Sequence, residues 1–429
     1  MNIAMFTNLY FPKVGGVSIS VDRFARACRE RGHEVLIVAP SFPQQERDEP
    51  GVFRVSAIQK FNGTDFSVAL PPGLELLRAL DEFEPDLIHS HHPFLLGDSA
   101  ARAATHRDLP LVYTHHTMYE HYTHYVPMDS KLLRNYVVQL TGRYADMCQL
   151  VIAPSRSVAD ILRRRGVSSS IEVIPTGLVV EDFSRGDRSR GRSRMGIGDG
   201  EFVIGHVGRL AEEKNLDFLT RAVIRAMREM DGSRFLVVGD GDLVPSMRRM
   251  IDEAGLSERA IFAGLRTGQE LADLYAAMDV FAFASKSETQ GMVLAEAMAA
   301  GAPIVVLNAP GARDVVRDGH NGRLVSDEDE AAFARALRSM ARLEPEEARA
   351  CREEARADAE EYSIDRCADR VLAAYRTVLD SQRPAGPADT SDWDGLLQTI
   401  RREWDLWANR AASLTDAIVT PDDPKEEPH

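Results

Sequence analysis

The amino-acid sequence predicts an α/β protein with two doubly wound parallel sheets that face a central cleft. Short apolar runs alternate with helical patterns along most of the chain, as expected when each parallel strand is followed by a crossover helix. These runs are continuous in apolar residues, which is typical of strands buried on both faces. One polar and basic stretch divides the runs into two series, so the sequence predicts two domains.

The first series belongs to an N-terminal domain, which we expect at residues 1–180. Its predicted strands are residues 3–6, 35–39, 86–90, 111–114 and 150–153. A helix is expected from about Ser18 to Arg31, where Gly32 ends it. Ligands of such sheets bind beyond the carboxyl ends of the strands, so we expect the functional residues there.

The boundary between the domains is predicted at residues 181–200. The run from Ser184 to Arg194 is small, polar and basic, with almost nothing to bury, so we expect a linker. A C-terminal domain is expected at residues 201–380. Its predicted strands are residues 202–208, 234–239, 260–264, 280–284 and 304–306.

A helical extension is predicted at residues 381–418, followed by a disordered tail at residues 419–429. The extension holds all three tryptophans, Trp393, Trp404 and Trp407, in a stripe at helical spacing. Such a stripe suits a helix that packs on a domain face. An amphipathic helix that touches lipid is the alternative, although the acidic residues around the tryptophans disfavour an anionic membrane.

The composition is that of an ordinary globular protein, and it excludes several classes. The 429 residues carry a formal net charge of −15, which argues against nucleic acid as a partner. Residues 1–180 contain 18 basic and 19 acidic residues, against 33 and 47 in residues 181–429, so the N-terminal part suits an anionic lipid surface better. The four cysteines show no C-x-x-C spacing, and neither a membrane span nor a signal peptide is evident. We therefore expect a cytoplasmic protein with reduced thiols.

Glu288 and Glu296 lie eight residues apart, between a predicted strand and the helix that follows it. Gln290 to Met292 would form the first helical turn, whose free N–H groups suit anions and hydroxyl-rich ligands. Two carboxylates beside such amides could bind several sugar hydroxyls at once. A solvated helix face is the alternative reading of the same pair.

Two cations follow the first strand of the second series. Gly208 permits a turn there, and Arg209 and Lys214 come after it at five-residue spacing. Arginine offers a fork of donors and lysine a compact charge, so together they suit a diphosphate. Ordinary surface ion pairing is the alternative.

Glycines mark other strand ends. Gly15 and Gly16 follow the first strand, where they would let the backbone approach a bulky anion or would simply form a tight turn. They do not form a G-x-G-x-x-G motif, which disfavours a dinucleotide cofactor. Gly239 ends a strand of the second series. The sequence also lacks a Walker loop, a G-x-S-x-G motif and an H-E-x-x-H motif.

The run from Glu288 to Glu296 resembles the E-x7-E motif of the retaining glycosyltransferases of family four. Its Glu-Thr-Gln-Gly form is similar to that of bacterial diacylglycerol glucosyltransferases. The run from Gly205 to Asn215 resembles the diphosphate site of the same superfamily. The resemblance covers about residues 1–380. It implies the GT-B fold, in which two Rossmann-like domains face a central cleft.

The resemblance implies roles for the residues of the second domain. Glu288 would contact the transferred sugar, Glu296 would hold the ribose hydroxyls, and the two cations would stabilise the leaving diphosphate. The implied donor site as a whole consists of Gly15, Gly16, Gly208, Arg209, Lys214, Gly239, Arg266, Glu288, Gln290, Gly291, Met292, Val293 and Glu296. Asp240 and Asp242 form an Asp-Gly-Asp run after Gly239, but its position matches the turn of the family's nucleotide pocket. The resemblance therefore assigns no Asp-x-Asp metal motif to the donor site, in agreement with metal-independent chemistry in the family.

The segment Thr114-His115-His116-Thr117 resembles another motif of the family and places His116 at the sugar. Glu288, Arg209, Lys214 and His116 are therefore the expected catalytic residues. Tyr119, His121 and Tyr122 follow, and we expect them to line the acceptor. A metal site in this segment is the alternative, but no cysteine or cluster of carboxylates completes it.

The sequence thus predicts a retaining, nucleotide-sugar-dependent hexosyltransferase that needs no cofactor and no metal. UDP-glucose is the expected donor. A lipid such as diacylglycerol or a glycolipid is the expected acceptor, with weak association of the enzyme with the inner face of the membrane. Transfer from GDP-mannose or UDP-glucose to a small polyol or phosphorylated acceptor is the alternative. A nucleotide-sugar epimerase, which would turn over donor without any acceptor, is a minor alternative.

Overall fold

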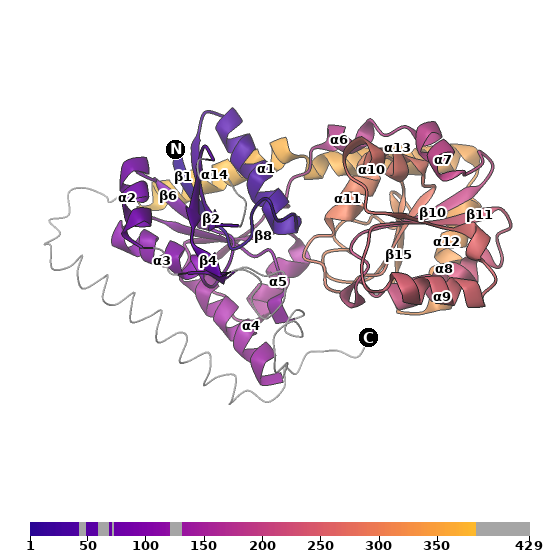
Figure 1. The fold of residues 1–429 in the computed structure, drawn as a ribbon, viewed down its shortest axis with the longest axis horizontal. Helices are drawn as coiled ribbons and strands as arrows, with labels where there is room; N and C mark the ends of the chain where they lie inside the picture. The colour runs from indigo at the N-terminus through magenta and orange to yellow at the C-terminus, as the bar shows by residue number, and fades with distance from the viewer. Residues whose placement is uncertain (43–48, 59–67, 71–72, 121–130, 383–429) are drawn as a thin grey trace, which may run out of the picture. The chain divides into compact units, whose positions relative to one another are not determined.

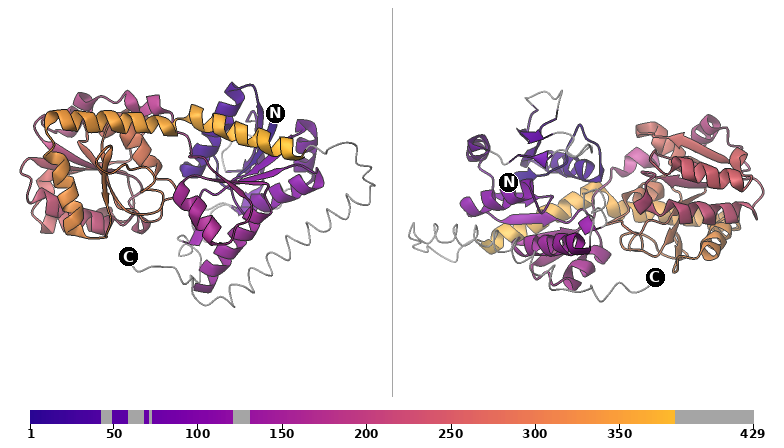
Figure 2. Two further views of the ribbon diagram at one scale, coloured as in Figure 1. Left: turned by 180° about the vertical axis from the view of Figure 1, so that it is seen from behind. Right: turned by 60° about the horizontal axis from the view of Figure 1, so that its bottom comes forward.

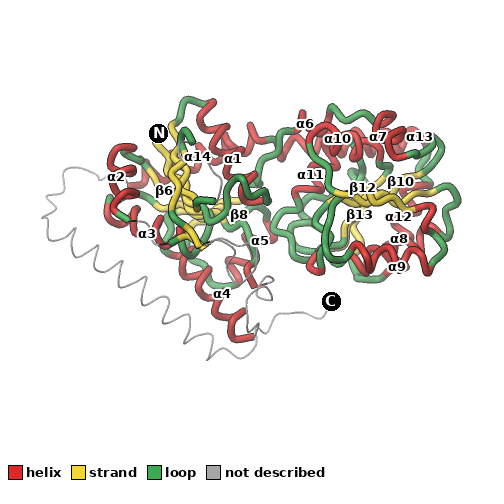
Figure 3. Tube along the Cα trace, viewed as in Figure 1, coloured by secondary structure: helices red, strands yellow, loops and turns green. Residues whose placement is uncertain are grey.

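Residues 1–42, 49–58, 68–70, 73–120 and 131–382 are described by the computed structural model, and they form two units (Figure 1). The first unit is Met1–Gly177 with the described residues from Cys367 onward, and the second is Leu178–Arg366. In each unit a parallel sheet lies in the middle and helices lie on both sides of it (Figure 3). The two doubly wound sheets expected from the sequence are confirmed.

The first unit contains a seven-stranded parallel sheet in the order β3-β2-β1-β6-β7-β8-β9. Its strands are β1 (Asn2–Phe6), β2 (Glu34–Pro40), β3 (Val52–Val55), β6 (Leu87–Ser90), β7 (Leu111–Thr114), β8 (Leu150–Ala153) and β9 (Ser170–Val173). A separate antiparallel pair joins β4 (Ala57–Ile58) and β5 (Val68–Ala69). The strand order reverses between β1 and β6, which is the position where open α/β sheets bind ligands.

Helices from both ends of the chain cover this sheet. They are α1 (Gly16–Glu30), α2 (Leu74–Phe83), α3 (Leu96–His106), α4 (Lys131–Asp146), α5 (Arg156–Arg164) and, from the far end of the chain, α14 (Ile364–Gln382). The Tyr375 hydroxyl on α14 lies 2.6 Å from Nδ1 of His89 on β6. Arg31, just after α1, forms an ion pair with Asp369 on α14 at 2.7 Å. Figure 2 shows α14, in yellow, from behind.

The second unit contains a six-stranded parallel sheet in the order β12-β11-β10-β13-β14-β15. Its strands are β10 (Phe202–Val207), β11 (Ser233–Val238), β12 (Ala260–Gly264), β13 (Val280–Phe283), β14 (Ile304–Leu307) and β15 (Gly322–Val325). Its helices are α6 (Val180–Ser184), α7 (Arg188–Met195), α8 (Leu216–Met227), α9 (Val244–Glu253), α10 (Gly268–Ala277), α11 (Met292–Ala299), α12 (Glu330–Ala341) and α13 (Pro345–Ala359). The order reverses between β10 and β13, so this unit repeats the arrangement of the first.

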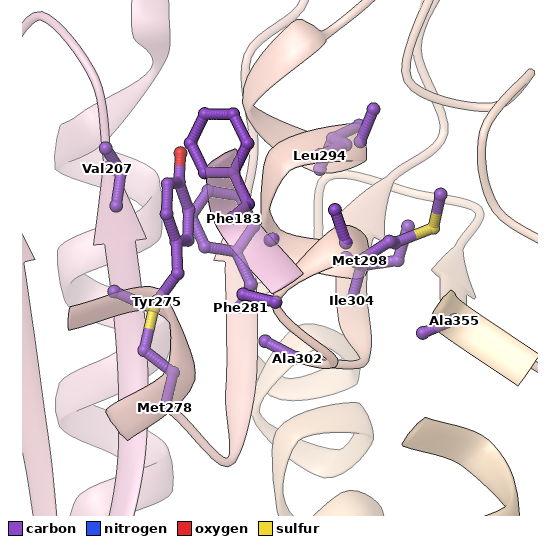
Figure 4. Packing of buried hydrophobic residues seen from close by; sticks show 14 of the residues in the cluster. Phe183, Val207, Tyr275, Met278, Phe281, Leu294, Met298, Ala302, Ile304 and Ala355 are labelled. Atoms are coloured by element: carbon purple, nitrogen blue, oxygen red, sulfur yellow. The ribbon is translucent and has the colours of Figure 1, made fainter. Parts of the chain in front are cut away.

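Strand β13 shows why these strands are continuous apolar runs. Phe281 and Phe283 join a core with residues of α6, α10, α11 and α13, whereas Val280 and Ala282 join a second core with residues of α8 and α12. Figure 4 shows part of the first core, where Phe281 lies beside Tyr275 of α10. Because both faces of the strand are buried, a polar residue on either face would lose its hydration.

The segment expected to be a linker is instead part of the second unit. Asp187 begins α7 by accepting a hydrogen bond from the backbone N–H of Arg190 at 2.8 Å. Gly191 lets α7 approach α10 closely, because a Cβ atom there would lie 2.2 Å from the carbonyl oxygen of Asp273. Arg192 is buried and forms an ion pair with Asp279 at 2.6 Å. The small and basic residues therefore serve packing and ion pairing rather than flexibility.

The ends of the units also differ from the expected domains. The first unit stops at Gly177, and Cys367 and the residues after it return to it through α14. Residues 383–429 lie outside the described residues, and with them nearly all of the predicted extension 381–418 and the predicted tail 419–429. Among the described residues, no helix is both long and apolar enough to cross a membrane.

Candidate active site

Most of the predicted site residues follow strand ends at the two reversals of strand order. In the second unit, Gly208, Arg209 and Lys214 follow β10, whereas Glu288 follows β13. Because parallel strands end at the same edge of a sheet, these two connections lie together. The N-terminus of α11 comes directly after the second connection.

Lys214 and Glu288 contact each other across this edge. The Nζ atom of Lys214 lies 2.5 Å from Oε1 of Glu288, and the two side chains are 18% and 17% exposed. Both are therefore largely shielded, yet they retain access to solvent. A buried charge needs an opposite charge beside it, and here the two expected site residues supply it to each other.

Arg209 is held by a residue that the sequence reasoning missed. Its Nη2 atom donates a hydrogen bond to a carboxylate oxygen of Glu213, four residues further along the chain. Glu213 is 5% exposed whereas Arg209 is 53% exposed, so the guanidinium group extends from a buried carboxylate into solvent. A fork of donors fixed in this way can bind a phosphate group with little loss of side-chain entropy.

The glycines at the strand ends allow close backbone contacts. Gly239 has a φ of +132°, and a Cβ atom there would lie 1.9 Å from the carbonyl oxygen of Gly208. No other residue would fit at this position without a shift of the β10 or β11 connection. Arg266 follows β12, is half-buried and donates a hydrogen bond to the carbonyl of Leu265.

Helix α11 begins two residues later than the sequence predicts, at Met292 rather than Gln290. Gly291 has a φ of +72° and precedes the helix, which begins at Met292. Gln290 is therefore in the connection, where it is buried, and the free N–H groups of the first turn begin at Met292 and Val293. Gln290 was expected in this turn because the sequence does not show that Gly291, the residue after it, adopts the left-handed conformation and so delays the start of the helix.

A second connection supports this loop. Gly311 has a φ of +76°, and a Cβ atom there would lie 2.6 Å from the carbonyl oxygen of Glu288 and 2.9 Å from the amide nitrogen of Gln290. The backbone around Gly311 thus packs against the backbone between these two residues. In the sequence, the one sign of this contact is a glycine followed by Ala-Arg after a strand. Many ordinary turns have the same sequence, so it did not identify Gly311 as part of the site.

Glu296 lies on α11 and is fixed by a buried tyrosine. The Tyr275 hydroxyl donates a hydrogen bond to Oε2 of Glu296 at 2.9 Å. Tyr275 is fully buried in the core of Figure 4, edge-on to Phe183 at 5.8 Å between ring centroids. Burial, with Glu296 beside it, raises the pKa of Tyr275 well above its usual value, so the hydroxyl keeps its proton.

Two histidines of the first unit contact each other after the neighbouring strands β6 and β7. His91 follows β6, His116 follows β7, and Nδ1 of His91 lies 2.8 Å from Nε2 of His116. Burial, with the other histidines adding to it, lowers the pKa of both side chains well below the usual value. Both imidazoles are therefore neutral near pH 7, and one donates this hydrogen bond to the other.

The other predicted site residues of the first unit lie around the start of α1 and after β7. Gly15 precedes α1 and its N–H donates to the Ser18 hydroxyl at 2.8 Å, while Gly16 is the first residue of the helix. Tyr119 lies edge-on to Phe94, with 5.0 Å between the ring centroids. His121 and Tyr122 lie outside the described residues. The structure adds Glu213, Tyr275, His91 and Gly311 to the candidate residues.

Both halves of the chain are similar in sequence to known proteins. The sequence model of Glycosyltransferase Family 4 matches residues 14–182, and that of Glycosyl transferases group 1 matches residues 201–342. An alpha-monoglucosyldiacylglycerol synthase of Streptococcus pneumoniae is 29% identical over 340 residues, which cover 78% of this chain and 77% of that protein. A GDP-mannose-dependent alpha-mannosyltransferase of Mycobacterium tuberculosis is 32% identical over 336 residues, 76% of this chain and 84% of that protein.

The fold has close structural neighbours as well. The crystal structure of Anabaena HepE in complex with UDP superposes with a TM-score of 0.71 at 22% identity, covering 88% of this chain and all of that one. Together the fold and the sequence relationships define a nucleotide-sugar-dependent glycosyltransferase with the GT-B fold. The chain belongs to Glycosyltransferase Family 4.

Proposed function

We propose that this glycosyltransferase moves glucose from UDP-glucose to a hydroxyl group of a lipid, such as diacylglycerol or a glycolipid, with retention of the anomeric configuration. The contact between Lys214 and Glu288 carries the assignment of the donor site. It brings a cation for the diphosphate and a carboxylate for the sugar to one edge of the sheet, directly before the N-terminus of α11.

In the proposed reaction the bond between the anomeric carbon and the phosphate oxygen breaks. The acceptor oxygen attacks the same face of the sugar, and its proton passes to the departing phosphate. Arg209 and Lys214 stabilise the negative charge that grows on the diphosphate, which is commonly the largest catalytic contribution. Glu288 and the N–H groups of Met292 and Val293 hold the sugar, and Glu296 holds the ribose.

Neutral His116 suits a role beside the sugar, because a neutral imidazole can both donate and accept a hydrogen bond. Its contact with His91 orients the ring. A fixed imidazole would bind one sugar hydroxyl and exclude water from the reacting carbon.

The lipid acceptor is supported by the names of two relatives, the alpha-monoglucosyldiacylglycerol synthases of Streptococcus pneumoniae and Acholeplasma laidlawii, each 29% identical. A second candidate is transfer from GDP-mannose, or transfer to a small phosphorylated polyol. It is supported by the mannosyltransferase described above and by a D-inositol 3-phosphate glycosyltransferase of Mycobacterium marinum, 30% identical over 392 residues.

One experiment separates these candidates. The purified enzyme is incubated with UDP-glucose, UDP-galactose or GDP-mannose, with either a lipid extract or a set of soluble polyols and their phosphates, and the products are identified by mass spectrometry. We expect a hexosyl lipid formed from UDP-glucose. A product formed only with GDP-mannose or only with a soluble acceptor would replace this assignment with the second candidate.

A lipid acceptor also implies weak and reversible membrane association. Co-sedimentation with lipid vesicles at low and high salt tests it, with Trp404→Ala and Trp407→Ala compared with the parent. We expect binding that resists moderate salt and weakens in both variants, because apolar insertion rather than charge would hold the enzyme. Failure of the parent to sediment with any lipid mixture would argue against the lipid acceptor.

A further inference from the structure

A pocket of about 270 Å³ lies in the second unit, at the amino edge of its sheet. Asp279 directly precedes β13 and is bonded by two of the side chains that line the pocket. Glu288 follows the other end of the same strand, so the pocket is separate from the donor site. The residues that line it are Gly186, Arg188, Ala276, Ala300, Arg352 and Arg356.

The pocket is rich in arginine. Asp279 receives three guanidinium groups, from Arg188 at 2.5 Å, from Arg192 at 2.6 Å and from Arg352 at 2.8 Å. A fourth, from Arg356, lines the pocket on the side of α13. No acidic side chain is among the lining residues described above, and no ion pair of Arg356 is found in the described part of the chain.

Some of this positive charge is compensated by helix ends. Arg188 donates to the carbonyls that end α10, at 3.4 Å for both Ala276 and Ala277. Arg352 donates to the carbonyl of Gly301, just beyond α11, at 3.2 Å. A helix C-terminus carries roughly −0.5 of an elementary charge, so two helix ends and Asp279, which also pairs with Arg192, offset only part of the positive charge of the three arginines that line the pocket.

The arginines are also close enough to repel one another. Burial lowers the pKa of Arg352, and the neighbouring Arg188, Arg356 and Arg192 lower it further, although Asp279 opposes them. The Arg356 guanidinium lies against the backbone of Gly301, where a Cβ atom would be 2.3 Å from its Nη2 atom. Two guanidinium groups held by Asp279 and a third that lies against Gly301 surround a small open space, an arrangement that suits an anion with several acceptor oxygens.

We propose that this pocket binds a phosphate dianion, either inorganic phosphate or the phosphate group of a small phosphomonoester. Arg188, Arg352 and Arg356 donate to its oxygens. The bound anion neutralises the excess charge where α7, α10 and α13 meet the start of β13. This site is independent of the proposed sugar transfer, and it uses none of the residues assigned to the donor.

The test must separate this pocket from the donor diphosphate site. We would titrate inorganic phosphate by calorimetry into the full chain carrying Arg209→Ala and Lys214→Ala, which removes both donor-site cations. The same background with Arg356→Gln removes one pocket guanidinium, and with Arg349→Gln it removes an exposed arginine of the same helix that pairs with Glu353. Glycerol 3-phosphate serves as a phosphomonoester probe.

We expect phosphate binding in the background protein, a loss of at least about tenfold in affinity with Arg356→Gln, and no change with Arg349→Gln. Tighter binding of glycerol 3-phosphate than of phosphate would identify a phosphomonoester as the ligand class, and equal or weaker binding would identify the free anion. The proposal is overturned if the background protein binds neither probe, or if Arg356→Gln binds them equally well. Arg356 is exposed, and thermal unfolding checks that its variant folds like the parent.

Discussion

The Nζ atom of Lys214 lies 2.5 Å from Oε1 of Glu288, and this contact joins the ends of the neighbouring strands β10 and β13 across 74 residues of sequence. In the absence of a donor the two charges compensate each other. A diphosphate would compete with Glu288 for the ammonium group, and a sugar would compete with Lys214 for the carboxylate. The first predictions follow from this exchange of partners.

Arg209→Ala and Lys214→Ala should each lower turnover much more than donor binding. The charge that these cations stabilise is largest in the transition state, and removing one such contact costs about 3–4 kcal/mol of barrier, or roughly 10²–10³ in kcat. Steady-state kinetics and calorimetry with the free nucleotide measure the two effects. Arg221→Ala is the matched control, because Arg221 is 49% exposed and also pairs with a glutamate. Near-normal kcat in both site variants would contradict the assignment.

Glu288→Gln and Glu296→Gln should impair different steps: the first should lower turnover, and the second should weaken nucleotide binding. Glu288 is assigned to the transferred sugar, so its replacement should reduce kcat while the free nucleotide binds almost as before. Glu296 is assigned to the ribose, so its replacement should weaken nucleotide binding. Calorimetry with UDP and GDP, alongside steady-state rates, separates the two. The roles would be wrong if both variants lost nucleotide affinity equally.

Tyr275→Phe should act through Glu296. The substitution keeps the buried ring but removes the hydrogen bond of 2.9 Å to the carboxylate. A hydrogen bond to a charged group contributes about 1.5–3 kcal/mol, so we expect nucleotide affinity to fall by roughly ten- to a hundredfold. The effect should nearly vanish when Tyr275→Phe is added to Glu296→Gln, and full additivity of the two changes would refute the coupling.

Activity should survive chelation. Asp240 and Asp242 follow Gly239 at a position that matches a turn of the nucleotide pocket rather than a metal motif, and Arg209 and Lys214 supply the positive charge that a divalent cation would otherwise provide. The assay is run with excess EDTA and compared with the same assay in Mg²⁺ or Mn²⁺. Complete loss in EDTA, with recovery on addition of either metal, would show that a cation takes part.

The first unit should lose stability in mild acid. Burial lowers the pKa of His89 and His92 to about 3 and that of His115 to about 4, whereas an unfolded histidine titrates near 6.5. Above about pH 6.5 these histidines are neutral in both the folded and the unfolded state, so they do not change the free energy of unfolding. Below it the unfolded chain binds more protons, so the free energy of unfolding falls by up to about 1.4 kcal/mol per pH unit for each histidine until the folded pKa is reached.

Urea unfolding followed by circular dichroism between pH 4.5 and 7.5 measures this dependence. His115→Gln should reduce the slope, because it removes one buried imidazole. His106→Gln is the control, since His106 is exposed at the end of α3. An unchanged slope in His115→Gln would mean that other groups cause the acid sensitivity.

Much of the fold was predictable because buried parallel strands leave a strong local signal. The strands at residues 111–114, 150–153 and 260–264 were predicted at the observed positions. β9 and β15 were missed because each lies at the edge of its sheet and mixes polar with apolar residues, as in Ser170–Val173 and Gly322–Val325. β3, at the other edge of the first sheet, was missed as well.

The linker shows the limit of local reasoning. Residues 184–194 have few apolar side chains, which in isolation predicts a flexible connection. Their partners, Asp273 and Asp279, lie more than 80 residues away and become visible only when α10 and the start of β13 fold against α7. Composition shows what a segment cannot bury by itself, but it does not show which carboxylates it will meet.

The sequence by itself determined the two doubly wound sheets, the polar residues at their carboxyl ends and the family to which the chain belongs. Those features depend on local patterns: the periodicity of apolar residues, the positions of strand ends and the spacing of residues within motifs. Each of these can be read from a short stretch of sequence. Only the tertiary structure decided that Lys214 contacts Glu288, that Tyr275 holds Glu296 and that His91 meets His116. Each of these contacts joins residues at least 21 positions apart, so it exists only because packing of the sheet and its helices brings separate segments together.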